Sequence, residues 1–378
     1  MRTRSGSLYS SSAAAGYSAT AVMGKKRTRA SPSAWSGQSA VAGECSGGRR
    51  RKRLAGGPDY LDELPDDLVL SILAKVAASA TAPSDLLSVH LTCKRLNGLG
   101  RHDMVFANAS PASLAVKAAS WSESAQRFLK RCADAGNLEA CYIVGMIRFY
   151  CLGHRSGGKA LLARAAVGMH AAAHYSLAVI KFNGSGGTKA DRDLHAGAAL
   201  CSRAAALGHV DALRELGHCY QDGYGVRRDP AEGRRLLVLA NARELTFALS
   251  AASNPAFTIP LGGGACSPLL SDFGWSLPEA EPHAVNQFMV DWWAADRGVC
   301  KDPAEEDGES VELRLCSNVR CGRRETRRHE FRRCSVCGAA NYCSRACQAL
   351  DWKRAHRALC VPNERWMIAG DGEAQPQY

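Results

Sequence analysis

Residues 334–360 read CSVCGAANYCSRACQALDWKRAHRALC, a stretch that holds five cysteines and one histidine. Two further cysteines precede it, so seven of the 16 cysteines in this 378-residue chain lie between Cys316 and Cys360. The chain shows no apolar core of a secretory signal, and thiols clustered without such a signal are better explained as reduced metal ligands than as disulfides. The clustering therefore predicts a metal-binding segment.

The candidate ligands form four pairs. A CxxC turn brings two thiolates to one ion, and residues four apart lie on one face of a helix. Eight ligands fill two tetrahedral sites and leave no position for water, which predicts two structural Zn²⁺ ions and no catalytic metal. The segment is poor in apolar residues, so metal binding would supply its folding free energy. Spacing alone does not decide which pairs share an ion. The pairs are Cys316 with Cys321, Cys334 with Cys337, Cys343 with Cys347, and His356 with Cys360.

The full pattern, C-x4-C-x12-C-x2-C-x5-C-x3-C-x8-H-x3-C over residues 316–360, resembles the MYND-type zinc finger, and NYCSRACQALDWKRAH is typical of that family. The resemblance implies interleaved sites. One zinc would take Cys316, Cys321, Cys343 and Cys347, and the other Cys334, Cys337, His356 and Cys360. The family usually has x2 in the first gap, which makes Cys316 the weakest assignment, with Cys300 and His329 as the nearest substitutes.

The resemblance also implies that the finger binds a short proline-containing peptide of a target protein. Gln348 and Trp352 lie four residues apart, on one face of an expected helix, and an exposed Trp is a good anchor for such a ligand. Trp352 as part of the core of the finger is an equal alternative. The basic run RRETRRHEFRR (residues 323–333) lacks the layout of a recognition helix, so nucleic acid is not indicated. We interpret this run as a solvated loop or a surface that attracts acidic peptides.

Residues 130–245 contain an internal repeat. Aligning DAGNLEACYIVG, AVGMHAAAHYSL and ALGHVDALRELG places three glycines in register, 32 and then 40 residues apart. Small residues at helical offsets let helices approach closely, and this period predicts stacked helix pairs. YQDGYGVRRDPAEGRRLL resembles the Sel-like branch of the tetratricopeptide superfamily. A solenoid of this kind would bind a peptide or protein, or else act as a spacer. The aligned positions are Gly136, Gly168 and Gly208; Ala140, Ala172 and Ala212; Gly145, Leu177 and Gly217.

Residues 58–106 predict a small helical bundle, with apolar residues at helical spacing and Pro65 near a helix start. LPDDLVLSIL followed by DLLSVHLTCKRLN resembles an F-box, the motif that docks onto the SKP-type adaptor of a cullin-RING ubiquitin ligase. The resemblance implies that Leu64, Pro65, Leu68, Ile72 and Leu73 face the adaptor. It also implies that the bundle is closed by Leu86, Val89, Cys93 and Leu96.

The remaining segments have simpler compositions. Residues 1–57 predict a disordered basic tail, because residues 1–53 carry 11 Lys or Arg and one acid. The runs KKRTR and RRRKR are of nuclear-import type, so we expect the protein in the nucleus, the cytoplasm or both. Residues 246–282 predict a linker, residues 283–312 a helical connector with an apolar stripe that packs on a neighbouring domain, and residues 363–378 a tail. No run is apolar enough for a membrane span.

The sequence thus predicts a mainly α protein: an F-box, an α-solenoid of Sel-like helix pairs and a two-zinc MYND finger. The combination resembles the plant F-box proteins with a MYND-type finger. That resemblance implies a substrate receptor of an SCF-type ubiquitin ligase without catalytic residues of its own. The alternative is an interaction scaffold or transcriptional corepressor. A lysine methyltransferase with an inserted finger needs a catalytic domain split around it, whereas 18 residues follow Cys360 and helical repeats precede it.

Overall fold

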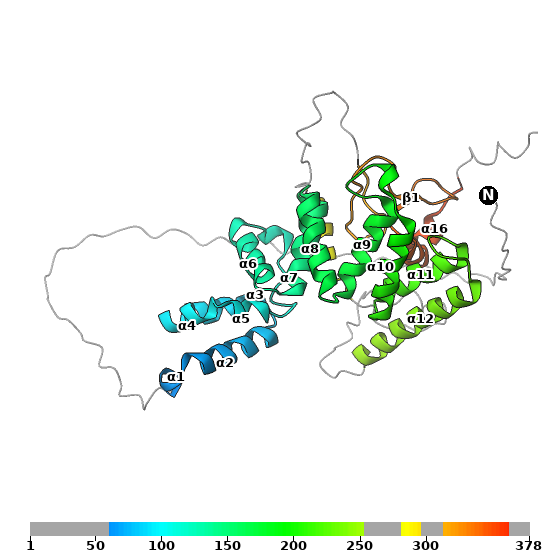
Figure 1. Cartoon of the computed structure of the whole chain (residues 1–378). Helices are drawn as coiled ribbons and strands as arrows, with labels where there is room; N and C mark the ends of the chain where they lie inside the picture. Colours follow the sequence, from blue (N-terminus) through cyan, green and yellow to red (C-terminus); the bar gives the residue numbers. More distant parts are fainter. Residues whose placement is uncertain (1–59, 253–280, 296–312, 363–378) are drawn as a thin grey trace, which may run out of the picture. The chain divides into compact units, whose positions relative to one another are not determined.

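The computed structural model describes residues 60–252, 281–295 and 313–362, and the expected tails, residues 253–280 of the linker and residues 296–312 of the connector lie outside these ranges. Helices dominate the described residues, as the mainly α prediction requires (Figure 1). No helix among them is long and apolar enough to cross a membrane.

The N-terminal part is a bundle of short helices. Pro65 occupies the N-cap of the longest one, and Asp66 and Asp67 in its first turn complement the helix dipole. One face of this helix is buried in the core, together with Leu86. The helices are α1 (Tyr60–Glu63), α2 (Asp66–Ser79), α3 (Pro83–Thr92), α4 (Lys94–Gly100) and α5 (Asp103–Ala107).

Two sequence assignments in this bundle are wrong. Leu73 lies with Val69 and Ala77 on the buried face of α2 and is 6% exposed, so its side chain is core and cannot face an adaptor. Cys93 does not close the bundle either. It is exposed at the N-cap of α4, where its Sγ accepts a hydrogen bond from the Leu96 amide.

The repeats extend beyond both predicted boundaries, from α6 to the end of α12, and consecutive helices pack against each other in chain order (Figure 1). The helices are α6 (Glu123–Asp134), α7 (Leu138–Met146), α8 (Arg155–Val167), α9 (Ala171–Asn183), α10 (Leu194–Ala206), α11 (Val210–Asp222) and α12 (Pro230–Ala252). Shorter turns are η1 (Ala118–Ser120), η2 (Ile147–Cys151), which continues α7 as a π-helix, and η3 (Lys189–Asp191).

The same turn precedes α7, α9 and α11 and fixes the register of the repeats. The amides of Asn137, His170 and His209 bond to carbonyl oxygens five residues earlier at 3.0, 3.1 and 3.0 Å, the pattern of a Schellman cap. The residue before each has positive φ, at Gly136 (96°), Met169 (65°) and Gly208 (89°).

The second predicted repeat is therefore displaced by one residue. Met169 occupies the place that the sequence alignment gave to Gly168, because three residues separate the helices at each turn and the middle one, Gly136, Met169 or Gly208, has the positive φ. Ala173 then replaces Ala172 as the partner of Ala140 and Ala212, and Ala178 replaces Leu177 as the partner of Gly145 and Gly217. Both replacements are fully buried.

Small residues at these positions allow adjacent helices to approach closely. A Cβ on Gly217 of α11 would lie 2.9 Å from Leu237 and 3.0 Å from the carbonyl oxygen of Gly233 on α12. A Cβ on Gly145 of α7 would lie 3.0 Å from Leu162 on α8. The recurrence of small residues in the sequence thus has a steric cause.

The connector contains α14 (Ala284–Ala294), and the prediction of an apolar stripe packed on a neighbouring domain is confirmed. Val285, Phe288, Met289 and Trp292 are buried against the repeats. The Phe288 ring meets that of Trp121 edge to face, with 5.1 Å between centroids. On the other side, Trp293 Nε1 donates to the carbonyl of Gly322 in the finger at 3.2 Å. The connector therefore joins repeats and finger.

A half-buried carboxylate connects the start of the connector to the repeats. Glu139 of α7 lies 2.9 Å from Nε2 of both His170 and His283, the N-cap of α14. Burial alone raises the pKa of this carboxyl, but the hydrogen bonds and charges of the two histidines outweigh it and bring the pKa to about 2. Glu139 is therefore ionised in the folded protein.

Candidate metal centres, peptide groove and adaptor face

The finger is built on little regular structure. Its strands β1 (Arg332–Arg333) and β2 (Asn341–Tyr342) are antiparallel, with Arg332 opposite Tyr342. They are followed by α15 (Arg345–Asp351), η4 (Trp352–His356) and α16 (Arg357–Leu359). A two-stranded hairpin with a short helix buries too little apolar surface to be stable alone, so other interactions must hold it.

The first cluster joins the two halves of the finger. Cys316 and Cys321 flank a turn beside the isolated bridge Leu315–Arg324, whereas Cys343 follows β2 and Cys347 lies in α15. All four thiols are buried and lie within 4.8 Å of one another. The Sγ of Cys343 is 3.6 Å from that of Cys321 and 3.6 Å from that of Cys347.

The second cluster joins the hairpin to the last helical turns. Cys334 and Cys337 come from the turn between β1 and β2, which Gly338 closes with a φ of 68°. The Cys334 Sγ lies 3.8 Å from that of Cys360, and the Cys337 Sγ lies 3.5 Å from His356 Nε2.

The structure brings together the two interleaved sets that the resemblance implied. Cys316 belongs to the first cluster, as assigned. His329 belongs to neither cluster, since its Nδ1 lies 2.6 Å from Arg333 Nη2. Cys300 falls outside the described residues.

The donor sets fit a structural divalent metal. Four sulfurs in one site, and three sulfurs with an imidazole nitrogen in the other, are the soft, closed sets that zinc prefers. The buried Arg323 guanidinium supplies a counter-charge to the first, with Nη1 3.5 Å from the Cys321 Sγ and 4.0 Å from that of Cys343. Its Nη2 donates to Ser176 of α9 at 3.1 Å, so the same side chain also contacts the repeats.

The finger is docked on the repeats through polar contacts with α9 and α11. The Ala346 amide, in the first turn of α15, donates to Oε2 of the buried Glu215 at 2.8 Å. Tyr175 Oη is 3.1 Å from Ser344 Oγ, and Asn183 donates to the carbonyl of Cys343 at 2.8 Å. Burial raises the pKa of Glu215, although the hydrogen bond from Ala346 opposes that effect.

This docking changes the expected role of the solenoid. The sequence predicts a helical row that is open to a partner or serves as a spacer, yet α9 and α11 already carry the finger of the same chain. Arg345 strengthens the contact, since it forms an ion pair with Asp222 and its guanidinium lies 5.4 Å from the Tyr224 ring. Finger and repeats therefore form one unit.

Gln348 and Trp352 share a groove of about 290 Å³, as their spacing predicts. Trp352 is 39% exposed, so its side chain is not buried in the core of the finger. His218 of α11 completes one wall, a contribution of the repeats that sequence reasoning missed because it depends on the docking. The other lining residues are Arg332, Arg345, Ala349 and Lys353.

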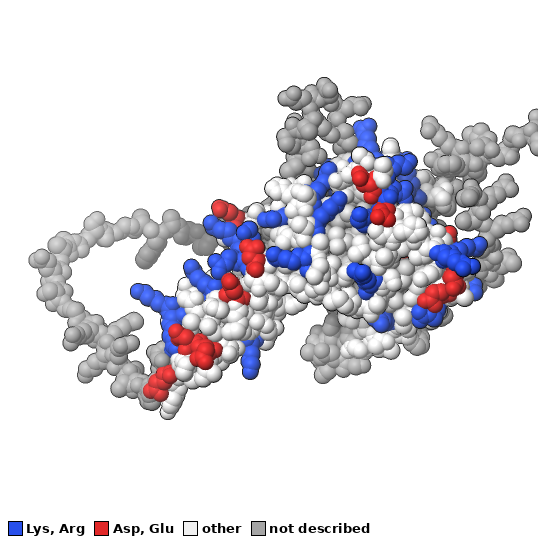
Figure 2. Space-filling model, viewed as in Figure 1, with Lys and Arg blue, Asp and Glu red and all other residues white. Residues whose placement is uncertain are grey.

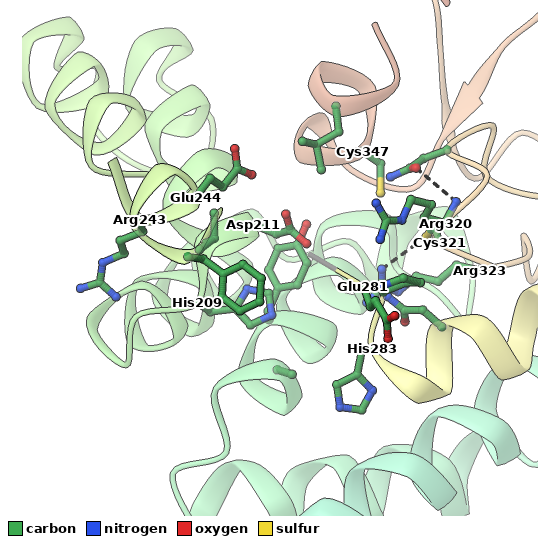
Figure 3. Close-up of a pocket in the computed structure, with 18 of the residues that line it drawn as sticks. His209, Asp211, Arg243, Glu244, Glu281, His283, Arg320, Cys321, Arg323 and Cys347 are labelled. Carbon is green, nitrogen blue, oxygen red and sulfur yellow. Dashed lines mark hydrogen bonds between the residues drawn. The ribbon is translucent and has the colours of Figure 1, made fainter. Parts of the chain in front are cut away.

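A larger cavity, of about 430 Å³, opens where α9, α11, α12, the start of the connector and the finger meet (Figure 3). Its walls mix basic residues such as Arg320 and Arg323 with acidic residues such as Asp211 and Glu244. Both acids face Arg214, at 3.4 and 2.7 Å. With charges of both signs engaged within the protein, this cavity favours no particular class of ligand.

The candidate adaptor face of α2 adjoins its buried face, because Leu68 and Ile72 each precede a buried residue by one position and point about 100° away from it. Leu68 and Ile72 are 49% and 43% exposed, Pro65 is exposed and Leu64 is half-buried. The structure adds apolar residues that the sequence assignment omitted, Leu87 and Leu91 of α3, both well exposed. Their spacing of four residues was a signal that could have found them.

Comparisons with known families agree with this division of the chain. The model described as plant tetratrico peptide repeats matches residues 113–197, the Sel1 repeat matches residues 210–243 and the MYND finger matches residues 316–360. The three models describe repeats and a finger and indicate no enzymatic family.

Two relatives extend over most of the chain. F-box protein At1g67340 of Arabidopsis thaliana is 57% identical over 327 residues, 84% of each chain. F-box protein At5g50450 of the same plant is 53% identical over 321 residues, 84% of this chain and 91% of its own. Among solved structures, a Sel1 repeat protein from Oxalobacter formigenes is similar at 25% identity and a TM-score of 0.29, covering 31% of this chain and 89% of its own.

Fold and site thus define a helical-repeat protein with a MYND finger docked on its repeats. The identity to the Arabidopsis proteins places it further: the chain belongs to the plant F-box proteins that carry repeats and a MYND finger.

Proposed function

We propose that the protein is the substrate receptor of an SCF-type ubiquitin ligase and binds the SKP-type adaptor through α2 and α3. The observation that carries this proposal is that α2 exposes Leu68 and Ile72, and α3 exposes Leu87 and Leu91, on a bundle whose core is filled by other residues. An apolar face of this kind, in a family named for the F-box, calls for a protein partner. The chain contributes binding and no catalytic group, and it acts in the nucleus, the cytoplasm or both.

In this proposal the finger and the repeats hold the target protein. The groove with Gln348 and Trp352 takes an extended, proline-containing segment of the target against the indole ring. Tethering target and adaptor on one chain raises the effective concentration of the target near the ubiquitin-charged enzyme. Two Zn²⁺ ions, one in each cluster, supply the folding free energy that the finger lacks.

Calorimetric titration of the full chain with an SKP-type adaptor tests the central part. We expect binding at micromolar affinity or better, and loss of measurable binding when Leu68→Ser and Ile72→Ser are combined. Both side chains are exposed, so the fold should tolerate the change. Val238→Ser is the matched control, because Val238 is exposed and apolar on α12 of the repeats. Equal binding by the double variant would refute the assignment of this face.

The alternative function is an interaction scaffold or corepressor that uses the finger alone. It predicts a folded, zinc-loaded protein that binds a target peptide and no adaptor. The same titration therefore separates the two functions.

A further inference from the structure

The groove beside Trp352 has an uneven charge. Of the residues that line it, Arg332, Arg345 and Lys353 are basic and none is acidic. Burial lowers the pKa of His218 to about 4, so this wall is neutral at pH 7. The indole, Ala349 and the stem of Gln348 leave a largely apolar floor between the basic side chains.

The acidic side chains of the finger are buried and do not contribute to its surface. Residues 313–362 contain three acidic residues, Glu325, Glu330 and Asp351, and all three are buried. Glu325 accepts from the amides of Arg314 and Phe331, Glu330 from the amide of Thr326, and Asp351 from the Tyr342 hydroxyl. None of these three carboxylates lines the groove, although Glu330 Oε2 lies 3.9 Å from Arg327 Nη1.

The exposed surface of the finger is consequently positive. Residues 313–362 carry 12 Lys or Arg, and Figure 2 shows Lys and Arg, with some acids among them, where the finger and the α9–α10 turn overlap in this view. Near the groove, Asp222 of α11 pairs with Arg345, whereas Arg332 on β1 projects into solvent. An apolar floor with a cationic rim is complementary to an apolar segment with acidic flanks.

We propose that this groove selects target segments in which a proline-containing apolar centre is flanked by Asp or Glu. The proposal rests on the proposed peptide-binding function of the finger and names the chemistry of its ligand. The centre lies on Trp352 and Ala349, while the flanking carboxylates lie beside Arg332 and Lys353. Because the repeats hold α15 in place and provide His218, the specificity belongs to the docked finger.

Fluorescence anisotropy with two labelled peptides tests the proposal on the zinc-loaded full chain. The peptides share one proline-containing apolar centre and carry either Glu or Gln at every flanking position. Exposed ion pairs contribute about 0.2–1 kcal/mol each, so the two contacts with Arg332 and Lys353 predict roughly fivefold tighter binding of the Glu peptide at 50 mM salt. Raising the salt to 500 mM should remove most of this preference.

Two matched variants locate the effect. Arg332→Gln should reduce the preference for the Glu peptide about two- to threefold. Arg328→Gln, which makes the same change at an exposed position outside the groove, should leave the preference unaltered. A role for Arg332 in folding alone would weaken both peptides equally, and that result would overturn the proposal.

The outcomes separate this inference from the function on which it rests. Equal binding of both peptides, lost in Trp352→Ala, would overturn the acidic preference and leave the peptide site standing. Failure of both peptides to bind would refute the peptide site itself. Displacement of the Glu peptide by an equal concentration of oligothymidylate would show that the basic rim binds nucleic acid, which also overturns the proposal.

Discussion

Substitution of Glu215 tests whether the finger and the repeats form one folding unit. Its buried carboxylate on α11 accepts the Ala346 amide at 2.8 Å, in the first turn of α15, where the helix dipole favours a negative charge. Glu215→Ala leaves that amide buried without an acceptor and empties the space of the side chain. We expect a loss of about 2–3 kcal/mol in the free energy of unfolding. Glu215→Gln keeps the volume and one carbonyl oxygen, and should cost about 1 kcal/mol.

The assay is urea unfolding of the zinc-loaded full chain, followed by two probes. Far-ultraviolet circular dichroism reports mainly on the repeat helices, and a colorimetric chelator reports zinc release from the finger. If the two parts unfold together, the transitions coincide in the wild type and both shift in Glu215→Ala, with a smaller shift in Glu215→Gln. A shift of zinc release alone, with the helical transition unchanged, would refute the single unit.

Three further predictions concern the repeats and the connector. Gly217→Ala forces a Cβ against α12 and should lower the free energy of unfolding by about 1–2 kcal/mol in urea titrations. The control is Gly98→Ala in α4, where a Cβ has no neighbour within 4 Å. This change should raise the free energy of unfolding by roughly 0.5–1 kcal/mol. Met169→Gly should stabilise by up to about 1 kcal/mol in the same assay, because Met169 is exposed and left-handed; destabilisation would contradict the register. The folded pKa of Glu139, about 2, lies below its usual 4.5, so its contribution of about 3 kcal/mol is complete above pH 4.5 and is lost as the pH falls towards 2. The free energy of unfolding, measured between pH 5 and 3, should therefore depend less on pH in Glu139→Gln than in the wild type. An equal pH dependence in both proteins would exclude the carboxylate–histidine contact.

The features predicted from the sequence are those set by local spacing. The metal-ligand pairs are closely spaced in the chain, and the pattern of the finger family supplied their grouping. The apolar stripe of the connector was also local, since Phe288 and Trp292 lie one helical turn apart. Such patterns carry their own geometry.

The features that were missed depend on contacts between distant segments. Leu73 and Ile72 are adjacent apolar residues, and only the packing of α2 decides which of them is core. The sequence suggested Gly168 as the left-handed residue of its turn. The hydrogen bond from the His170 amide to the Ala165 carbonyl shows that Met169 is the left-handed residue. The docking of the finger rests on buried polar residues such as Glu215, which periodicity assigns to no interface.

Native mass spectrometry of the full chain mixed with an SKP-type adaptor tests the central claim most directly. The account predicts a 1:1 complex that carries two Zn²⁺ ions, and its disappearance when Leu68→Ser and Ile72→Ser are combined, with both ions retained. A chain that carries two Zn²⁺ ions and never binds the adaptor would contradict the receptor function and leave the peptide-binding scaffold.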